Sequence, residues 1–199
     1  MIHGNMPLQL CAIAISFSVS FGMSCRRRAS SSRSQAARAS MLSILRGNLP
    51  NLVFQPSDRD PDALQSVAAR VKATRVINVL APAVLDALQS AWPIPSADGI
   101  ICINMVHISP WEATLGLVRG AAAILPSTAP FYLYGPFKRE GFATTPSNQA
   151  FDRDLRRREP TWGLRDLEAV AAVAQSVGFS VPTITEMPAN NLSVVFRRI

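Results

Sequence analysis

From about residue 48 onward, short apolar runs alternate with longer segments whose apolar residues recur every three or four positions. Runs of four to seven mostly apolar residues, bounded by proline, glycine or polar clusters, are typical of buried β-strands. The last two runs flank the turn Pro-Ala-Asn-Asn and are expected to form a closing pair. The pattern predicts strands at residues 51–55, 75–80, 99–105, 131–134, 183–187 and 192–197.

Helical periodicity fills the intervals between these strands. Residues 60–72 begin with Asp60 as a candidate cap and Pro61 in the first turn, and residues 164–177 form an amphipathic segment that ends at Gly178. The other predicted helices are residues 83–91, 111–125 and 147–158. Strands that alternate with helices predict an α/β fold, here a doubly wound, mostly parallel sheet with an antiparallel edge pair.

Residues 1–47 have a different character. Residues 8–23 are moderately apolar but shorter than the roughly 18–20 residues of a transmembrane helix, and residues 24–41 are rich in serine, arginine and alanine. Arg26–Arg28 follow the apolar stretch, whereas a signal peptide has its positive charges in front. The sequence therefore predicts a disordered or non-native segment at 1–47, one domain at 48–199 and no membrane span, with a secreted enzyme cleaved near Cys25 as an alternative.

The net charge of +7 is concentrated in this first segment. Six arginines and no acid precede Asp58, so residues 1–57 carry +6 and the remaining 142 residues carry +1. Nucleic-acid binding usually needs a basic face on a folded module, so the sequence does not favour a nucleic-acid partner. The three cysteines show no CxxC spacing, and the chain has two histidines, one of them in the first segment. We therefore expect a reduced, cytoplasmic protein with no metal site.

Polar residues that directly follow the predicted strands are the candidate ligand site, because ligands lie beyond the carboxyl ends of strands in such sheets. Asp58 could accept two hydrogen bonds from a ribose, or could cap the next helix. Asn78 and Leu80 could meet an adenine, or could be ordinary strand residues. Asn104 and His107 follow the most apolar strand, where the histidine is either functional or structural. Cys102 lies within that strand and is expected to be an unreactive core thiol.

Several long segments resemble the methyltransferase-like 26 family, a poorly characterised group with a class I S-adenosylmethionine-dependent methyltransferase fold. The resemblance covers residues 49–198, and it implies a methyltransferase that acts on an unknown acceptor. It assigns the ribose of S-adenosylmethionine to Asp58, the adenine to Asn78–Leu80, and the neighbourhood of donor and acceptor to Asn104, Met105 and His107. No catalytic residue is assigned. The segments that carry it are LVFQPSDRDPD (52–62), DGIICINMVHISPWE (98–112), FYLYGPFKREG (131–141), TPSNQAFD (145–152), EPTWGLRDLE (159–168) and MPANNLSVVFRR (187–198).

One part of the family pattern is missing. A first strand with a glycine-rich loop, V-L-E-x-x-S-G-x-G-E-H, should precede the NLVFQPSD segment, but residues 31–45 contain no glycine. Glycine is needed there because the backbone passes close to the donor. With suitable synonymous codons, residues 32–41 read in a shifted frame spell Glu-Ile-Ala-Ser-Gly-Ser-Gly-Glu-His. We therefore expect a frameshifted segment and impaired donor binding; the alternative is a non-catalytic interaction module with a genuine basic arm.

Overall fold

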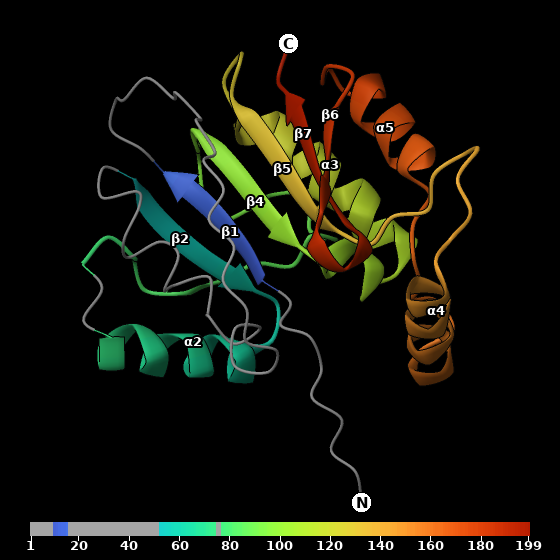
Figure 1. The fold of residues 1–199 in the computed structure, drawn as a ribbon. Helices are drawn as coiled ribbons and strands as arrows, with labels where there is room; N and C mark the ends of the chain where they lie inside the picture. Colours follow the sequence, from blue (N-terminus) through green and yellow to red (C-terminus); the bar gives the residue numbers. More distant parts are fainter. Residues whose placement is uncertain (1–9, 16–51, 75–76) are drawn as a thin grey trace, which may run out of the picture.

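The computed structural model describes residues 10–15, 52–74 and 77–199. Within this part of the chain, seven strands form one sheet in the order β3-β2-β1-β4-β5-β7-β6 (Figure 1). The strands are β1 (Leu10–Ile15), β2 (Val53–Asp58), β3 (Ala83–Val84), β4 (Gly99–Ile103), β5 (Pro130–Gly135), β6 (Thr183–Met187) and β7 (Asn191–Arg197).

Five of these strands run in one direction. The pairs β2–β3 and β4–β5 are parallel, while β7 is antiparallel to both of its neighbours, β5 and β6. The prediction of an α/β fold with an antiparallel edge pair is therefore confirmed, but the sheet is mixed rather than mostly parallel, since four of its six described strand pairs are antiparallel. The carboxyl ends of β2, β3, β4 and β5 consequently meet at one edge of the sheet, where the candidate residues were expected.

Strand β1 occupies the centre of the sheet in the reverse direction. It is antiparallel to both β2 and β4, and its arrow in Figure 1 points against theirs. Leu10 pairs with Ile103 at the carboxyl edge, and Ile15 pairs with Val53 at the opposite edge. The sequence predicted that the first strand and its glycine-rich loop are missing; the structure places residues 10–15 at this position in the sheet, in the reverse direction. The other predictions about residues 1–47 lie outside the described residues.

The helices follow the predicted pattern closely. Asp60 caps the first of them, since its Oδ1 accepts a hydrogen bond from the N–H of Asp62 at 3.0 Å. The amphipathic helix begins at Leu167 rather than at residue 164, because residues 163–165 bind to the loop after β4. The described helices are α2 (Pro61–Thr74), α3 (Trp111–Ile124), α4 (Pro146–Arg158) and α5 (Leu167–Ser176), with short 3₁₀ turns η2 (Met105–His107) and η3 (Pro188–Asn190).

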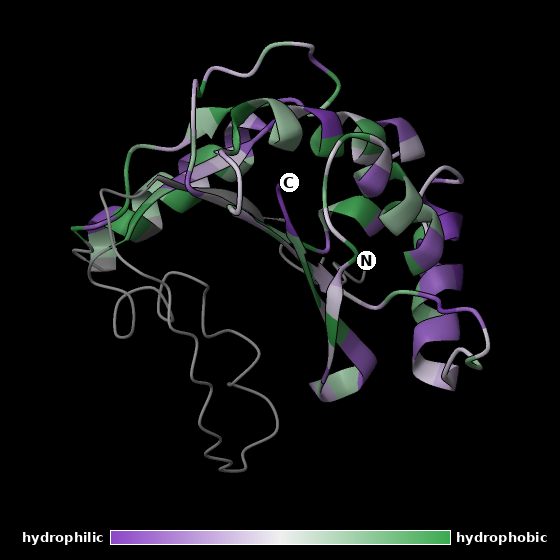
Figure 2. Ribbon diagram, turned by 90° about the horizontal axis from the view of Figure 1, so that it is seen from above, coloured by the Kyte–Doolittle hydropathy of each residue, from purple (hydrophilic) through white to green (hydrophobic). Residues whose placement is uncertain are grey.

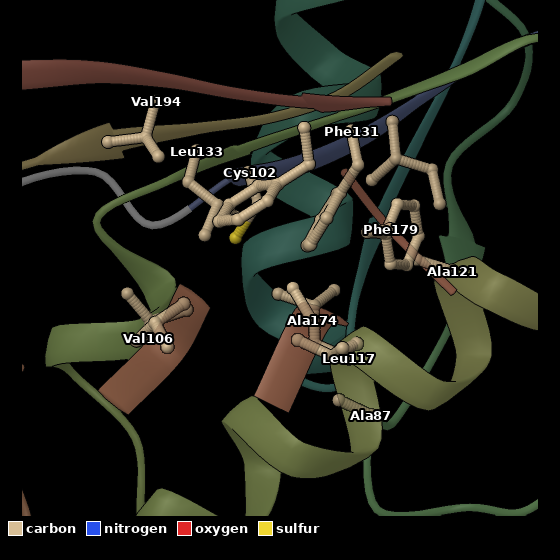
Figure 3. Packing of buried hydrophobic residues seen from close by; sticks show 14 of the residues in the cluster. Ala87, Cys102, Val106, Leu117, Ala121, Phe131, Leu133, Ala174, Phe179 and Val194 are labelled. Atoms are coloured by element: carbon tan, nitrogen blue, oxygen red, sulfur yellow. The ribbon is translucent and has the colours of Figure 1, made fainter. Parts of the chain in front are cut away.

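Helices cover both faces of the sheet. On one face, Phe54 of β2 packs with Val71 of α2 and Ile101 of β4. On the other face, α3 and α5 pack against alternate residues of β4, β5 and β7, and these side chains form the main core (Figure 3). Phe131, Phe179 and Phe196 stack in its centre, with ring centroids 5.3–6.4 Å apart. The prediction that Cys102 is a buried thiol in this core is confirmed.

Two predicted elements around β3 are wrong. The expected strand at 75–80 is reduced, within the described residues, to a single bridge between Val79 and Phe54, and the ladder resumes only at Ala83. Pro82 interrupts it because proline has no N–H to donate. The expected helix at 83–91 is instead β3 followed by a turn in which Asp86 Oδ1 accepts the N–H of Leu88. Pairing with β2 therefore overrides the local helical pattern.

Candidate functional site

A shallow hollow of about 50 Å³ lies at the carboxyl ends of β2, β3 and β4. Its described lining comes from three chain segments that are far apart in the sequence and meet at this edge of the sheet. Ser57, Asp58 and Arg59 come from the end of β2, Leu85, Asp86 and Ala87 from the end of β3, and Met105, Ile108, Ser109 and Ala113 from the loop after β4 and the start of α3.

Asp58 is the polar group at the end of β2. Its Oδ1 accepts a hydrogen bond from the N–H of Asp60 at 3.0 Å, which fixes the side chain in the turn before α2. Asp60, and not Asp58, performs the helix-capping role that the sequence left open. The second carboxylate oxygen of Asp58 has no hydrogen-bond partner among the described residues, so it can accept hydrogen bonds from a ligand in the hollow.

Asn78 and Leu80 lie elsewhere. The Asn78 side chain donates to the carbonyl oxygen of Leu52 at 3.0 Å, which is beyond the amino end of β2. Leu80 donates its N–H to Phe54 in the middle of β2. The structure therefore does not bring these two residues to the hollow. Residues 85–87 line the hollow instead, and the sequence analysis missed them. The feature that could have identified them is Asp86, the first acidic residue after the apolar run of 76–85.

Asn104 stands at the seam between β4 and β5. Its backbone is left-handed, with φ 58° and ψ −13°, a conformation in which asparagine is enriched among non-glycine residues. The Asn104 N–H donates to Tyr134 O at 2.8 Å, and the side chain has no hydrogen bond to any described residue. This sharp turn ends β4 two residues before its predicted end and directs Met105 into the hollow.

Arg165 fixes the loop that follows Asn104. Its Nε donates to the carbonyl oxygen of Val106 at 2.9 Å, and its Nη2 donates to those of Ser109 at 2.5 Å and Thr161 at 3.0 Å. Ser109 Oγ in turn donates to Met105 O at 2.8 Å. One guanidinium thus ties both ends of the loop to the segment before α5. Local sequence patterns do not indicate this role, because residue 165 lies more than fifty positions further along the chain.

His107 is fully buried beneath this loop. Its ring packs edge-on against Phe137, with centroids 4.6 Å apart, and its Nδ1 accepts the backbone N–H of Arg165 at 3.4 Å. Nδ1 as an acceptor places the ring proton on Nε2, which has no hydrogen-bond partner among the described residues. Burial, and after it the charge of Arg165, lowers the pKa of His107 to about 3, against an opposing effect of Asp152.

These contacts decide how His107 can act. A neutral ring whose Nδ1 is occupied and whose Nε2 carries the proton is a hydrogen-bond donor and a poor base. His107 is absent from the described lining of the hollow. Gly135 leaves the space for the ring, because a Cβ at that position would lie 2.5 Å from His107 Nε2 and 3.0 Å from Asn104 Oδ1. The structure therefore supports the structural interpretation of this histidine.

A second, larger cleft of about 290 Å³ lies beyond the end of β5. One side of it is the segment 137–145, and the other consists of α4 and the β6–β7 turn, which lie next to each other in Figures 1 and 2. Asn148 Nδ2 of α4 donates to the carbonyl oxygen of Asn190 at 3.0 Å and joins these elements. Asn190 has φ 57°, as its position in the predicted turn required.

Lys138, which lines this cleft, is paired with an acidic residue of α4. Lys138 Nζ lies 3.0 Å from Asp152 Oδ2. Burial raises the pKa of Asp152, but hydrogen bonds from Leu164 N–H and Lys138 and the charges of Lys138 and Arg156 lower it more. Burial and Tyr132 raise the pKa of the Tyr134 hydroxyl, against a hydrogen bond with Asn191.

The described residues hold no group of three or more histidine, cysteine or acidic side chains that could bind a metal ion. In the same part of the chain, no helix is both long enough and apolar enough to cross a membrane.

Comparison with known proteins places the chain in a family. The model of a family described as a protein of unknown function, DUF938, matches residues 42–198. This match covers most of the sequence, and the chain therefore belongs to that family. The matched span begins a few residues before the domain boundary predicted at residue 48.

Solved structures with a similar fold include methyltransferases. The S-adenosylmethionine-dependent methyltransferase SibL in its apo form is 19% identical, with a TM-score of 0.66 over 80% of this chain and 47% of that chain. PigF with SAH is 14% identical, with a TM-score of 0.65 over 79% and 46%. An O-methyltransferase family protein from Burkholderia thailandensis is 15% identical, with a TM-score of 0.61 over 79% and 47%. This chain spans slightly less than half of their length and has the class I methyltransferase fold.

Proposed function

We propose that this chain is the donor-binding domain of an S-adenosylmethionine-dependent methyltransferase. The observation that carries the proposal is the hollow at the carboxyl ends of β2, β3 and β4, where a carboxylate faces apolar side chains. The fold alone would not suffice, since one fold hosts many functions. The position of Asp58 beside Leu85 and Met105 gives that fold a surface suited to a nucleoside.

The types of residue that line the hollow suit the nucleoside half of S-adenosylmethionine, and its volume of about 50 Å³ means that a bound nucleoside would lie partly outside it. The second oxygen of Asp58 can accept hydrogen bonds from ribose hydroxyls, and Asp86 offers another acceptor next to it. Leu85, Ala87 and Met105 supply apolar surface for a planar base. PigF with SAH shows a related fold with a product of this donor.

The methionine half finds less support in this chain. In the class I fold a glycine-rich loop after the first strand approaches that half of the donor. Here the carboxyl end of β1 pairs with Val53 at the opposite edge of the sheet. A strand of this length spans roughly 17 Å at about 3.4 Å per residue, so a loop that begins there starts far from the hollow. We propose that donor binding is impaired in this chain for this reason.

The arrangement of these residues favours a mechanism in which the protein promotes methyl transfer by positioning the donor and the acceptor. The donor supplies a sulfonium-activated methyl group when it is bound, and the protein's task is then to align an acceptor. Asn104 lies at the seam between the ends of β4 and β5, and Arg165 holds the loop that follows it. His107 supports this loop from below and is not assigned as a base. Within the family, the motifs of the sequence favour the methyltransferase-like 26 group.

Adenosine and S-adenosylhomocysteine provide the test, because adenosine requires only the nucleoside half of the site. We expect adenosine to bind the full chain, measured by calorimetry or ligand-observed NMR, and Asp58→Asn to weaken it about ten-fold, as expected for hydrogen bonds to a charged group. Asp62→Asn is the matched control, since Asp62 is an exposed acid of α2 that does not contact the hollow.

The same binding experiment tests whether affinity for the methionine half of the donor is impaired in this chain. S-adenosylhomocysteine should bind this chain little more tightly than adenosine. A second chain, in which residues 32–41 are replaced by Glu-Ile-Ala-Ser-Gly-Ser-Gly-Glu-His, should gain affinity for S-adenosylhomocysteine but not for adenosine. Adenosine binding that is indifferent to Asp58→Asn would refute the assignment of the hollow.

A further inference from the structure

Two adjacent cations, Lys138 and Arg139, line the larger cleft, but only one of them is available to a ligand. Lys138 is held on Asp152, whose side chain is 16% exposed. The same carboxylate also accepts the N–H of Leu164 at 2.8 Å and Nε of Arg156 at 3.2 Å. A carboxylate with three donors in a protected position is a permanent partner, and Lys138 is therefore part of the scaffold.

Arg139 is held in place but poorly satisfied. Its guanidinium lies over the ring of Phe142, 3.9 Å from the centroid, and its side chain is 22% exposed. Among the described residues its only side-chain hydrogen bond is a single one, from Nη2 to Glu186 Oε1 at 3.0 Å. A guanidinium has five N–H donors, so most of them have no partner among the described residues, and Arg139 belongs to the lining of the cleft.

Glu186 is a replaceable partner for this guanidinium. Its side chain is 77% exposed, and it makes one contact with Arg139. Exposed ion pairs of this kind contribute little, so a ligand carboxylate can displace Glu186 into solvent at small cost. The contact of Arg139 with Phe142 persists during the exchange and keeps the fork oriented.

The opposite wall of the cleft is already formed. Asn148 Nδ2 donates to Asn190 O at 3.0 Å, and Asn190 Nδ2 donates to Ser147 Oγ at 3.1 Å. These bonds fix the β6–β7 turn against α4, so little ordering is required on binding. The cleft volume of about 290 Å³ is close to the lower limit of roughly 300 Å³ for small-molecule sites.

We propose that this cleft binds the methyl acceptor, and that the acceptor is a small molecule whose carboxylate pairs with Arg139. Its role as acceptor site rests on the proposed function; its binding of a carboxylate does not. A carboxylate is favoured over a phosphate because the displacement of Glu186 leaves one uncompensated positive charge. The planar fork of arginine also matches the geometry of a carboxylate.

Benzoate and benzamide are suitable probes, because they share a shape and differ in charge. Saturation-transfer NMR titrations would use the full chain and its Arg139→Gln, Arg139→Lys and Glu186→Gln variants. Arg157→Gln is the control, since Arg157 is 80% exposed on α4 and pairs with Asp154 outside the cleft. Thermal melting of each variant shows that it is folded.

We expect benzoate to bind the wild-type chain. Its affinity should fall about ten-fold or more in Arg139→Gln and should rise in Glu186→Gln. Arg157→Gln should change nothing, Arg139→Lys should retain part of the affinity, and benzamide should be indifferent to Arg139. The proposal is overturned if the wild type shows no saturable benzoate binding, if folded Arg139→Gln binds benzoate as the wild type does, or if phenyl phosphate binds ten-fold more tightly. Adenosine binding is measured in a separate experiment. If the proposed donor site fails that test, the benzoate titration still shows whether the cleft binds a carboxylate.

Discussion

The buried His107 makes the stability of the fold sensitive to mild acid. In the unfolded chain a histidine takes up a proton near pH 6.5, whereas in the folded chain the pKa of His107 is about 3. Between these values the unfolded state binds more protons than the folded state, so stability rises with pH. The full contribution is present above pH 6.5 and is lost progressively as the pH falls toward 3.

The size of the effect follows from the two pKa values. Each pKa unit corresponds to about 1.4 kcal/mol, so the whole shift represents on the order of 5 kcal/mol. Lowering the pH from 7 to 5 protonates nearly all unfolded chains at this residue and almost no folded ones. The free energy of unfolding should therefore fall by about 2 kcal/mol over this range. The low pKa of Asp152 does not interfere, because that carboxylate titrates below its ordinary value of 3.8.

Urea unfolding, followed by tryptophan fluorescence at pH 7, 6 and 5, measures this directly. His3 is the other histidine of the chain, so His3→Gln should leave the pH dependence unchanged, whereas His107→Gln should abolish most of it. Because His107→Gln could be too unstable to measure, hydrogen–deuterium exchange at the imidazole C2 of the unmodified chain provides a second readout. A folded-state titration of His107 near pH 6.5, or equal stability at pH 7 and 5, would show that the reasoning is wrong.

Three further substitutions test other contacts of the site. Gly135→Ala introduces a methyl group 2.5 Å from His107 Nε2 and should cost about 1–3 kcal/mol of stability by urea unfolding, while Gly141→Ala, which meets open space but has φ 75°, is the control for backbone strain alone. Arg165→Gln leaves three carbonyl oxygens without their charged donor and should cost about 2 kcal/mol and weaken adenosine binding, with Arg165→Lys restoring part of both. Asp152→Asn should remove the part of acid unfolding that occurs below pH 3.8, seen as a flatter circular-dichroism titration in that range.

The sequence predicted the elements that hydrophobic periodicity defines. Helices α2, α3 and α4 and strands β5, β6 and β7 lie within two or three residues of the expected bounds, because proline, glycine, capping residues or a tight turn mark their ends. The region of residues 75–91 failed because two short pairing segments with β2 are separated by Pro82. Neither segment is long enough for its apolar residues to show a strand or helix periodicity.

The candidate site was predicted in part for the same reason. Asp58 was chosen because it follows a correctly placed strand, and both Asp58 and Met105 line the hollow, whereas Asn104 is not part of its described lining. Asn78 and Leu80 were chosen from a strand whose end was misplaced, so the position after β3 was taken by Leu85 and Asp86 instead. Arg165 and Arg139 depend on contacts between distant segments, and local sequence patterns carry no information about such contacts.

The direction of β1 explains how this fold and its donor site can become separated. The inner edges of β2 and β4 both present unpaired N–H and C=O groups, and an apolar segment between them satisfies these groups whether it runs parallel or antiparallel. Periodicity does not distinguish the two directions, and six residues such as LCAIAI can supply the central strand in either. A methyl donor makes a stricter demand, because only a strand that runs with β2 and β4 delivers a following loop to the hollow. A chain that places its central strand in reverse can therefore retain the sheet, both helical layers and the cleft beyond β5, and under the proposed function it would still lose affinity for the methionine half of the donor.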